Sequence, residues 1–375
     1  MMTDVQAYAR SCFTGATPDR LGVELEFLVF DADAPARQVP VARIVQALPP
    51  LPGGSRVTFE PGGQLELSAP PRVLPEAVAA LTADVDAVRR ALRQAGLRLG
   101  CRGLDVLRPP VRQLRDARYD AMAAFLGEPY GPAMMCSTVS VQVNVDLGDD
   151  PEGRWRRAHD LGPALVAAFA NSPAGGWASG RQAVWRHLDP TRTRPVDVGG
   201  DPVLDWGRYL LDARLMMVRE EGGFRPVLDG TVFRDFARVA GRHPTEDDLV
   251  HHATTLFPPV RPRGWLEIRY LDGQGPDEWP VCAAVVHALV TDERAGEAAM
   301  EAAAPVRRRW DEAARLGLAD PGMRRAADGC FRAALAALPR LGAEPWLVAR
   351  VAAFASRHIE SGRSPALDLM EEMFA

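Results

Sequence analysis

Polar and apolar side chains alternate along four short segments of the chain, at residues 21–31, 64–68, 134–146 and 265–272. Successive side chains in a β-strand point to opposite faces of the sheet, so each segment predicts a strand with one apolar and one polar face. The segment 134–146 is the most regular, because valines occupy every second position from Val139 onward. We expect the valine side to face the core.

Apolar residues at helical spacing predict helices between and after these strands. The clearest helix is expected at 75–95, because a proline stands in its first turn and Gly96 can end it. Further helices are expected at about 153–170 and 201–218. Beyond Asp277 the chain is rich in Ala and Leu at helical spacing, which predicts several packed helices.

These elements predict an α+β fold built on an antiparallel β-sheet. We expect the sheet to form a concave cradle with helices covering its other face. A chain of 375 residues can bury one large core, and no obvious linker divides it. Residues 1–375 are therefore expected to form a single domain, with 277–375 as its mainly helical part.

The polar faces of the predicted strands carry carboxylates, amides and an arginine. Each face alone also fits a strand exposed to solvent. If the strands share one sheet, five carboxylates meet on one surface, where they cannot all ionise without cations. Ligands that are all oxygen favour Mg²⁺ or Mn²⁺ over zinc. The residues are Glu24, Glu26, Gln64, Glu66, Gln142, Asn144, Glu267 and Arg269, with Glu60 just before the second strand.

A glycine-rich loop after the helix expected at 153–170 delivers Arg181 and, further on, Arg192. A guanidinium group matches the oxygens of carboxylates and phosphates, and glycine lets the backbone approach a ligand. Arginine is the only basic residue type of the chain, so these arginines also fit an ordinary surface. Beside several divalent ions, however, an anion site suggests nucleotide phosphates and predicts an enzyme that uses ATP and Mg²⁺.

Composition excludes several function classes. The chain contains no lysine, which excludes a Walker A loop and a pyridoxal-phosphate Schiff base. A net charge of -5 argues against nucleic-acid binding. The five cysteines form no Cys-x-x-Cys pair, and neither a secretory signal nor an apolar run long enough for a bilayer is visible. We expect a cytoplasmic protein without membrane contact.

Together the motifs resemble those of the glutamate-cysteine ligases of the plant and bacterial type. They are Glu24-Leu-Glu26, Glu60-Pro-Gly-Gly-Gln64-Leu-Glu66-Leu-Ser68, Val141-Gln142-Val143-Asn144-Val145-Asp146, Ser179-Gly-Arg181 with Trp185, Asp189 and Arg192, and Leu266-Glu267-Ile268-Arg269. Met134-Met135 and the stretches 255–263 and 265–272 are similar to the actinobacterial members that serve ergothioneine biosynthesis. The resemblance begins near Cys12, reaches the C-terminal helices, and implies a fold related to the catalytic sheet of glutamine synthetase.

The resemblance implies that the chain joins the γ-carboxyl of glutamate to the amine of cysteine through a γ-glutamyl phosphate. The product would be γ-glutamylcysteine for ergothioneine biosynthesis, and ATP would be the co-substrate. It further implies Mg²⁺ or Mn²⁺ ligands at Glu24, Glu26, Glu60, Glu66 and Glu267. Arg269 and Glu66 would be catalytic, with Arg269 steadying the transferring phosphoryl group. Substrate contacts would come from Arg181, Tyr119, Gln142, Asn144 and Arg192.

Two other interpretations fit parts of the pattern. A related carboxylate-amine ligase would keep the sheet, the metals and the acyl phosphate but accept a different amine. A structural module that binds divalent ions would explain the acids but not the arginines and amides that accompany them. The sequence specifies no oligomeric state, and a monomer is compatible with it.

Overall fold

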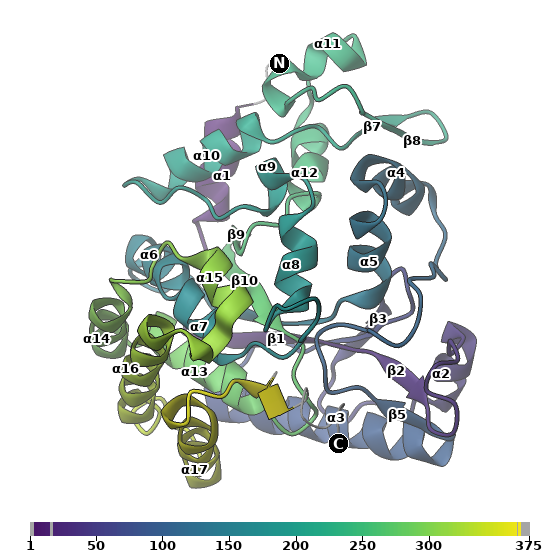
Figure 1. The fold of residues 1–375 in the computed structure, drawn as a ribbon. Coiled ribbons are helices and arrows are strands. Elements are labelled where there is room, and N and C mark those ends of the chain that lie inside the picture. The colour runs from purple at the N-terminus through teal and green to yellow at the C-terminus, as the bar shows by residue number, and fades with distance from the viewer. Residues whose placement is uncertain (1–3, 16–17, 366, 369–375) are drawn as a thin grey trace.

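A six-stranded antiparallel sheet forms the centre of the computed structural model, which describes residues 4–15, 18–365 and 367–368 (Figure 1). The strand order is β3-β4-β1-β6-β10-β9, and every neighbouring pair is antiparallel. The four segments predicted from alternation therefore lie side by side. The strands are β3 (Arg56–Phe59), β4 (Leu65–Ser68), β1 (Leu21–Phe27), β6 (Ser140–Asp146), β10 (Trp265–Asp272) and β9 (Val260–Pro262).

The apolar face of this sheet lies in the main core. Val23 and Leu25 of β1 and Val143 of β6 are at most 1% exposed, as the alternation predicted. Helix α13 (Trp279–Thr291), which is buried along its whole length, packs against β6 and β1. Helix α3 (Leu74–Gln94) packs against β1 and α7 (Gly162–Ala168) against β10. Apolar burial thus fixes which sheet face is covered.

The polar face lies toward a second group of helices. Figure 1 shows α8 (Gly180–Arg186) and α5 (Tyr130–Ser137) on the side of the sheet opposite α3 and α13. Helix α8 contacts β10 and α5, and α5 contacts α4 (Ala117–Leu126). The α+β class, the antiparallel sheet and the helical layer on its apolar face are confirmed.

Three local predictions were wrong. The helix expected at 153–170 divides into α6 (Pro151–Asp160) and α7, because Pro163 lacks the backbone N–H that a continuous helix would need. The helix expected at 201–218 ends at Asp212 as α10 (Pro202–Asp212), and Met217 begins a hairpin strand. The strand predicted from residue 134 begins only at Ser140, because residues before it belong to α5.

The remaining elements complete the fold around the sheet. Every regular element described after Asp277 is a helix, as expected for that part of the chain. No helix among the described residues has the length and hydropathy to cross a bilayer. The elements are α1 (Val5–Cys12), β2 (Val29–Asp31), α2 (Val41–Ala47), β5 (Leu97–Leu99), α9 (Pro190–Thr193), β7 (Met217–Glu220), β8 (Gly223–Pro226), η1 (Phe233–Asp235), α11 (Phe236–Ala240), α12 (Glu246–Thr254), α14 (Glu293–Ala303), α15 (Trp310–Leu316), η2 (Gly317–Ala319), α16 (Pro321–Ala337), α17 (Pro345–Phe354) and η3 (Ala355–Glu360).

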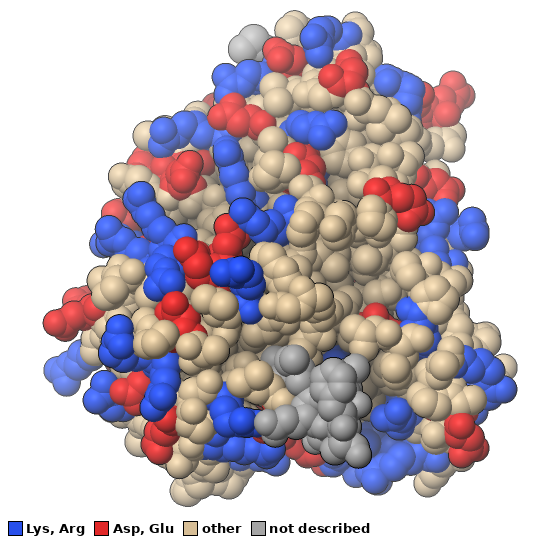
Figure 2. All heavy atoms as spheres, viewed as in Figure 1, with Lys and Arg blue, Asp and Glu red and all other residues tan. Residues whose placement is uncertain are grey.

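Charged side chains of both signs are interspersed over the molecular face in Figure 2. The chain carries 44 basic and 49 acidic residues, and acidic side chains lie among the arginines of this face. A nucleic-acid-binding protein gathers positive charge on one surface. The face in view shows no such gathering.

Candidate active site

Strand pairing brings the predicted polar residues onto one face. Glu26 of β1 lies opposite Glu66 of β4, and Glu24 lies opposite Gln142 of β6. On the other side of β6, Asn144 lies opposite Glu267 of β10. Directly opposed residues of antiparallel strands project to the same side. The polar face predicted strand by strand is therefore continuous across β4, β1, β6 and β10.

Three carboxylates of this face converge. One oxygen each of Glu26, Glu60 and Glu66 lies within 4.8 Å of the other two, a spacing that could hold a metal ion. Glu60 reaches this position from the turn before β4. Gly63 of that turn has φ +90°, which strongly favours glycine, and a Cβ on Gly62 would lie 2.5 Å from the backbone of Cys136. Both glycines therefore set the position of Glu60.

Neutral side chains and one backbone amide hold Glu24 and Glu26 in place. Ser140 donates two hydrogen bonds to Glu26, from its backbone nitrogen at 2.8 Å and its hydroxyl at 2.9 Å. Gln142 donates from Nε2 to Glu26 at 2.8 Å, and Asn144 donates from Nδ2 to Glu24 at 3.0 Å. The two amides that were predicted as substrate contacts thus hold carboxylates in this structure.

Hydroxyl groups hold Glu66 on the neighbouring strands. Thr58 of β3 donates to Glu66 at 2.6 Å, and Ser68 donates to the same oxygen at 2.8 Å. Because both hydroxyls bond to the same oxygen, the other carboxylate oxygen of Glu66 has no protein donor among the described residues. Sequence reasoning missed Thr58 and the role of Ser140, because a hydroxyl on a polar strand face carries no specific signal.

The carboxyl groups hold their protons more tightly than ordinary ones. Burial raises the pKa of Glu24 to about 7, and repulsion from Glu267 and Glu66 adds to the increase. Burial and the nearby Glu26 and Glu66 raise the pKa of Glu60 to about 8. The pKa of Glu26 is raised by burial and then by Glu66. A cation is what would allow this group of acids to ionise together.

Tyr119 lies at the edge of this cluster, on α4. Burial raises the pKa of its phenol, and the carboxyl of Glu60 raises it further. Tyr119 is therefore close enough to Glu60 to feel its charge, and its predicted contact with substrate stays a prediction. Its aromatic ring packs in a small apolar group with Met122 and Met135.

Glu267 differs from the other acids of the face. Arg261 donates to it from Nε at 2.5 Å and from Nη2 at 3.1 Å, and Arg269 lies 3.1 Å away. Burial opposes its ionisation, but Arg261 and Arg269 lower its pKa to about 2. Arg263 adds a third ion pair at 3.5 Å. Glu267 is thus ionised, and its negative charge is paired with three arginines.

Arg269 lies on the polar face, within a β-bulge of β10. The pairing of β10 with β6 shifts by one residue between Ile268 and Leu271, which leaves an extra residue in β10. Within this irregular stretch, Arg269 donates from Nη1 to Gln142 at 2.5 Å. Its guanidinium therefore spans the space between Glu267 and the amide that also holds Glu26.

Arg181 reaches the same region from α8, whose N-terminus is capped by the hydroxyl of Ser179. The side chain is 4% exposed, and Nη2 donates to the backbone oxygen of Arg269 at 2.9 Å. In the part of the chain that the structure describes, Nη1 has no hydrogen-bond partner. With Arg269 and Trp185 it lines a narrow cleft. A buried, unpaired donor of a charged group requires an acceptor, which a ligand can supply.

Arg192 lies apart from the acids. It is fully buried, and its guanidinium donates to Asp189 at 3.0 Å and to the backbone oxygens of Thr255 at 2.7 Å and Arg214 at 2.6 Å. The guanidinium also stacks over the ring of Phe125. These contacts tie three loops together and occupy the donors that an anion would need.

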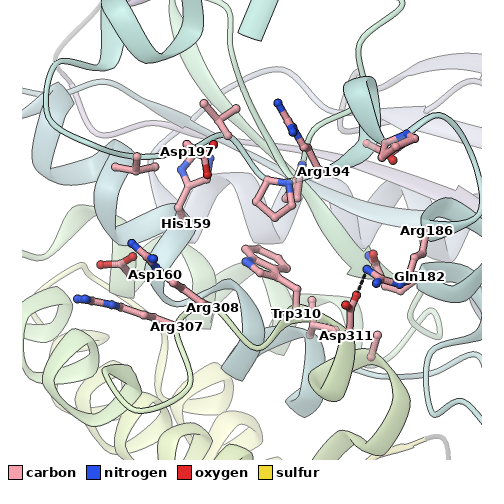
Figure 3. A pocket seen from close by; sticks show the side chains of 18 of the residues that line it. His159, Asp160, Gln182, Arg186, Arg194, Asp197, Arg307, Arg308, Trp310 and Asp311 are labelled. Atoms are coloured by element: carbon pink, nitrogen blue, oxygen red, sulfur yellow. Dashed lines mark hydrogen bonds and ion pairs between the residues drawn. The ribbon is translucent and has the colours of Figure 1, made fainter. Parts of the chain in front are cut away.

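A cavity adjoins the cleft of Arg181, and none of the five predicted metal-binding glutamates lines it (Figure 3). Its volume is about 890 Å³, and its walls include His159, Arg308 and Trp310. Gln182 and Trp185 line both this cavity and the cleft of Arg181, so the two adjoin. Arg308 and Trp310 come from the C-terminal helical part of the chain, where no motif predicted a binding site.

Comparisons with known proteins show the family of the chain. Residues 20–373 match the family described as Glutamate-cysteine ligase family 2 (GCS2). The chain is 42% identical over 379 residues to the glutamate–cysteine ligase EgtA of Mycolicibacterium smegmatis, covering 95% of this chain and 88% of that protein. It is 30% identical over 246 residues to the chloroplastic glutamate–cysteine ligase of Medicago truncatula, covering 60% and 48% of the two chains.

Two solved structures share the fold. One is the glutamate–cysteine ligase of Francisella tularensis in complex with AMP, with a TM-score of 0.53 and 12% identity over 96% of this chain and 85% of that one. The other is a bifunctional glutathione synthetase from Pasteurella multocida, with a TM-score of 0.52 and 14% identity over 100% and 51% of the two chains. At such identities the likeness shows the fold alone.

Proposed function

The chain belongs to glutamate-cysteine ligase family 2, and from this premise we propose that it joins glutamate to cysteine with the consumption of ATP. The observation that carries the proposal is the meeting of Glu26, Glu60 and Glu66 with Arg269 and the open guanidinium of Arg181. The resemblance of residues 255–272 to ergothioneine-pathway members supports γ-glutamylcysteine for that pathway as the product.

The reaction needs an activated carboxyl group. The γ-carboxylate of glutamate takes the γ-phosphoryl group of ATP and releases ADP. The amine nitrogen of cysteine, after losing a proton, attacks the acyl carbon, and phosphate leaves with the former carboxylate oxygen. Positioning and charge neutralisation supply most of the catalysis of such phosphoryl transfer. A buried surface with both acids and arginines suits that requirement.

The donor set fits divalent ions that prefer oxygen. We propose that Glu24, Glu26, Glu60 and Glu66 hold Mg²⁺ or Mn²⁺, because all four offer oxygens on one face. The raised pKa values of Glu24, Glu26 and Glu60 favour a cation beside them. The close spacing of Glu26, Glu60 and Glu66 favours it as well. When bound, such ions would neutralise the phosphate charge. Glu267, predicted as a fifth ligand, is better explained as the residue that orients Arg269.

The arginines would divide the anionic groups between them. We assign the transferring phosphoryl group to Arg269, because its guanidinium lies between Glu267 and the amide of Gln142 beside the acid cluster. We assign a substrate carboxylate to Arg181, since its buried Nη1 lacks an acceptor. The cavity beside it is large enough for the remainder of an amino-acid substrate.

A coupled assay for ADP with glutamate, cysteine and Mg²⁺, with the dipeptide identified by mass, tests the proposal. Glu26→Gln and Glu66→Gln should each abolish glutamate-dependent ADP release while the protein stays folded. Glu246→Gln is the matched control, because Glu246 is exposed in the first turn of α12. Near-normal turnover of either site variant would overturn the metal assignment.

A different amine acceptor remains the alternative within the same chemistry. The same assay with a panel of amines separates the two, because activation of glutamate depends on the acid cluster in both cases. Cysteine should give the highest turnover per enzyme. Faster turnover with another amine would retain the ligase chemistry and replace the acceptor.

A further inference from the structure

A buried carboxylate that the proposed chemistry does not use stands at the end of β10. Asp272 is 2% exposed and lies three residues beyond Arg269. Among the described residues it makes no ion pair with any arginine. Its carboxylate accepts hydrogen bonds from the backbone N–H of Asn171 at 2.8 Å and from the hydroxyls of Ser172 and Ser179, which lead to the start of α8, the helix that carries Arg181.

Two serine hydroxyls connect Asp272 to the first turn of α8. Ser172 donates to one carboxylate oxygen at 2.7 Å, and Ser179 donates to the other at 2.8 Å. Each hydroxyl also accepts a backbone hydrogen bond from the helix, Ser172 from Arg181 at 3.0 Å and Ser179 from Gln182 at 3.1 Å. The carboxylate therefore fixes the direction in which both hydroxyls donate and accept.

The bulge that contains Arg269 brings Asp272 to this position. Glu267 lies opposite Asn144 before the bulge, and Asp272 lies opposite Ser140 after it. Strict alternation from Glu267 would have turned Leu271 to the polar face and Asp272 to the core. The extra residue reverses that assignment. Strand β10 consequently supplies both an arginine of the site and the anchor of the helix that bears the other.

Asp272 and the guanidinium of Arg181 influence each other's charge. Burial lowers the pKa of the Arg181 guanidinium, and the largest opposing influence is the negative charge of Asp272. Burial raises the pKa of Asp272, and Arg181 is the foremost opposing charge. Each group thus compensates the other without a direct contact. That arrangement leaves Nη1 of Arg181 free for another acceptor.

We propose that Asp272 is a positioning residue of the ligation reaction, which acts through Ser172 and Ser179 to hold the guanidinium of Arg181 open toward a substrate carboxylate. The inference rests on the proposed function, because it takes Arg181 as the group that binds this carboxylate. It assigns Asp272 no contact with substrate, nucleotide or metal.

Steady-state kinetics of Asp272→Asn test the proposal. The change keeps the shape of the side chain but removes its charge and one of the two acceptors for serine hydroxyls. We expect KM for the substrate that Arg181 binds to rise about tenfold, with kcat within about threefold and KM for ATP unchanged. Asp146→Asn is the control, since Asp146 is a similarly buried acid at the end of β6 that pairs with Arg20.

A double-mutant cycle separates positioning from general destabilisation. If Asp272 acts through Arg181, the variant Asp272→Asn/Arg181→Ala should have the same KM as Arg181→Ala alone. Independent, multiplying effects would overturn the proposal, as would an unchanged KM in folded Asp272→Asn. Should Asp272→Asn fail to fold, Ser179→Ala removes one link of the same connection and is judged by the same cycle.

The wild-type assay keeps this test distinct from that of the proposed function. Absence of glutamate- and cysteine-dependent ADP release in the wild-type protein would refute the ligase assignment. Normal wild-type turnover together with unaltered KM values in the Asp272 and Ser179 variants would refute the positioning role alone.

Discussion

Binding of Mg²⁺ to the metal-free protein should release protons, because the carboxyl groups that would hold it are partly protonated near neutral pH. The pKa of Glu60 is raised to about 8 and that of Glu24 to about 7. At pH 7 these groups hold about 0.9 and 0.5 proton respectively. If both ionise in the complex, Mg²⁺ binding releases about 1.4 protons. Glu26, whose pKa is also raised, can only add to this.

The same linkage sets the pH dependence of Mg²⁺ affinity. Affinity should increase about 50-fold from pH 6 to pH 7 and about tenfold from pH 7 to pH 8, as the two groups give up their protons. The stability of the metal-free protein should change in the opposite direction. Because both folded-state pKa values lie above the unfolded value of about 4.3, the contribution of these groups is present at low pH and is lost as pH rises through 7 to 8.

Titration calorimetry with Mg²⁺ alone, at pH 7 in two buffers of different ionisation enthalpy, measures the number of protons released. The variant Glu60→Gln should reduce the release by about 0.9 proton, the share of Glu60, and leave the shares of Glu24 and Glu26. Proton release near zero in the wild-type protein would refute the reasoning. Equal release from wild type and Glu60→Gln would assign the protons to other groups.

Three further predictions concern residues that support the site. Arg192→Met should lower the free energy of unfolding by about 3–5 kcal/mol in urea titrations, because it leaves the buried carboxylate of Asp189 unpaired. The KM values of the substrates should stay unchanged. A selective rise in one substrate KM would instead support the predicted substrate role of Arg192. Phe331→Ala should cost about 3–5 kcal/mol by the same measurement, since its buried ring packs against those of Phe169 and Phe354. A cost below about 1 kcal/mol would contradict that packing. Gly63→Ala should lower kcat and the melting temperature, because the φ of Gly63 is +90° and the new Cβ would lie 2.4 Å from the side-chain amide nitrogen of Gln113. Unchanged kcat and melting temperature would show that the turn tolerates a side chain.

The sequence predicted the strands and their polar faces because alternation is a local property. Glu24, Glu26 and Glu66 could be placed on strand faces from their neighbours alone, and the register confirms that the faces coincide. The order of strands in the sheet could not be predicted, since pairing depends on residues far apart in the chain. Metal ligation and substrate contacts at these residues stay predictions.

Other features have no local signal. The bulge in β10 exists only relative to β6, so Leu271 and Asp272 would have been assigned to the wrong faces by strict alternation. The ion pairs of Glu267 depend on Arg261, which reaches it from the neighbouring strand β9.

The division of a helix near Pro163 could have been predicted from the proline itself.

The place of β1 in the sheet has a consequence for how the chain is made. Strand β1 leaves the ribosome first but lies between β4 and β6, and β6 is covered only when β10 pairs with it. Until residue 272 has been synthesised, β6 is an open edge with a valine-rich face that α13 has not yet covered. The acids of β1 and β4 are likewise made well before Arg181, Arg261 and Arg269. The nascent chain therefore carries these acids without Arg261 and Arg269 until residue 261 has been made, and it carries the open edge of β6 from residue 146 to residue 272.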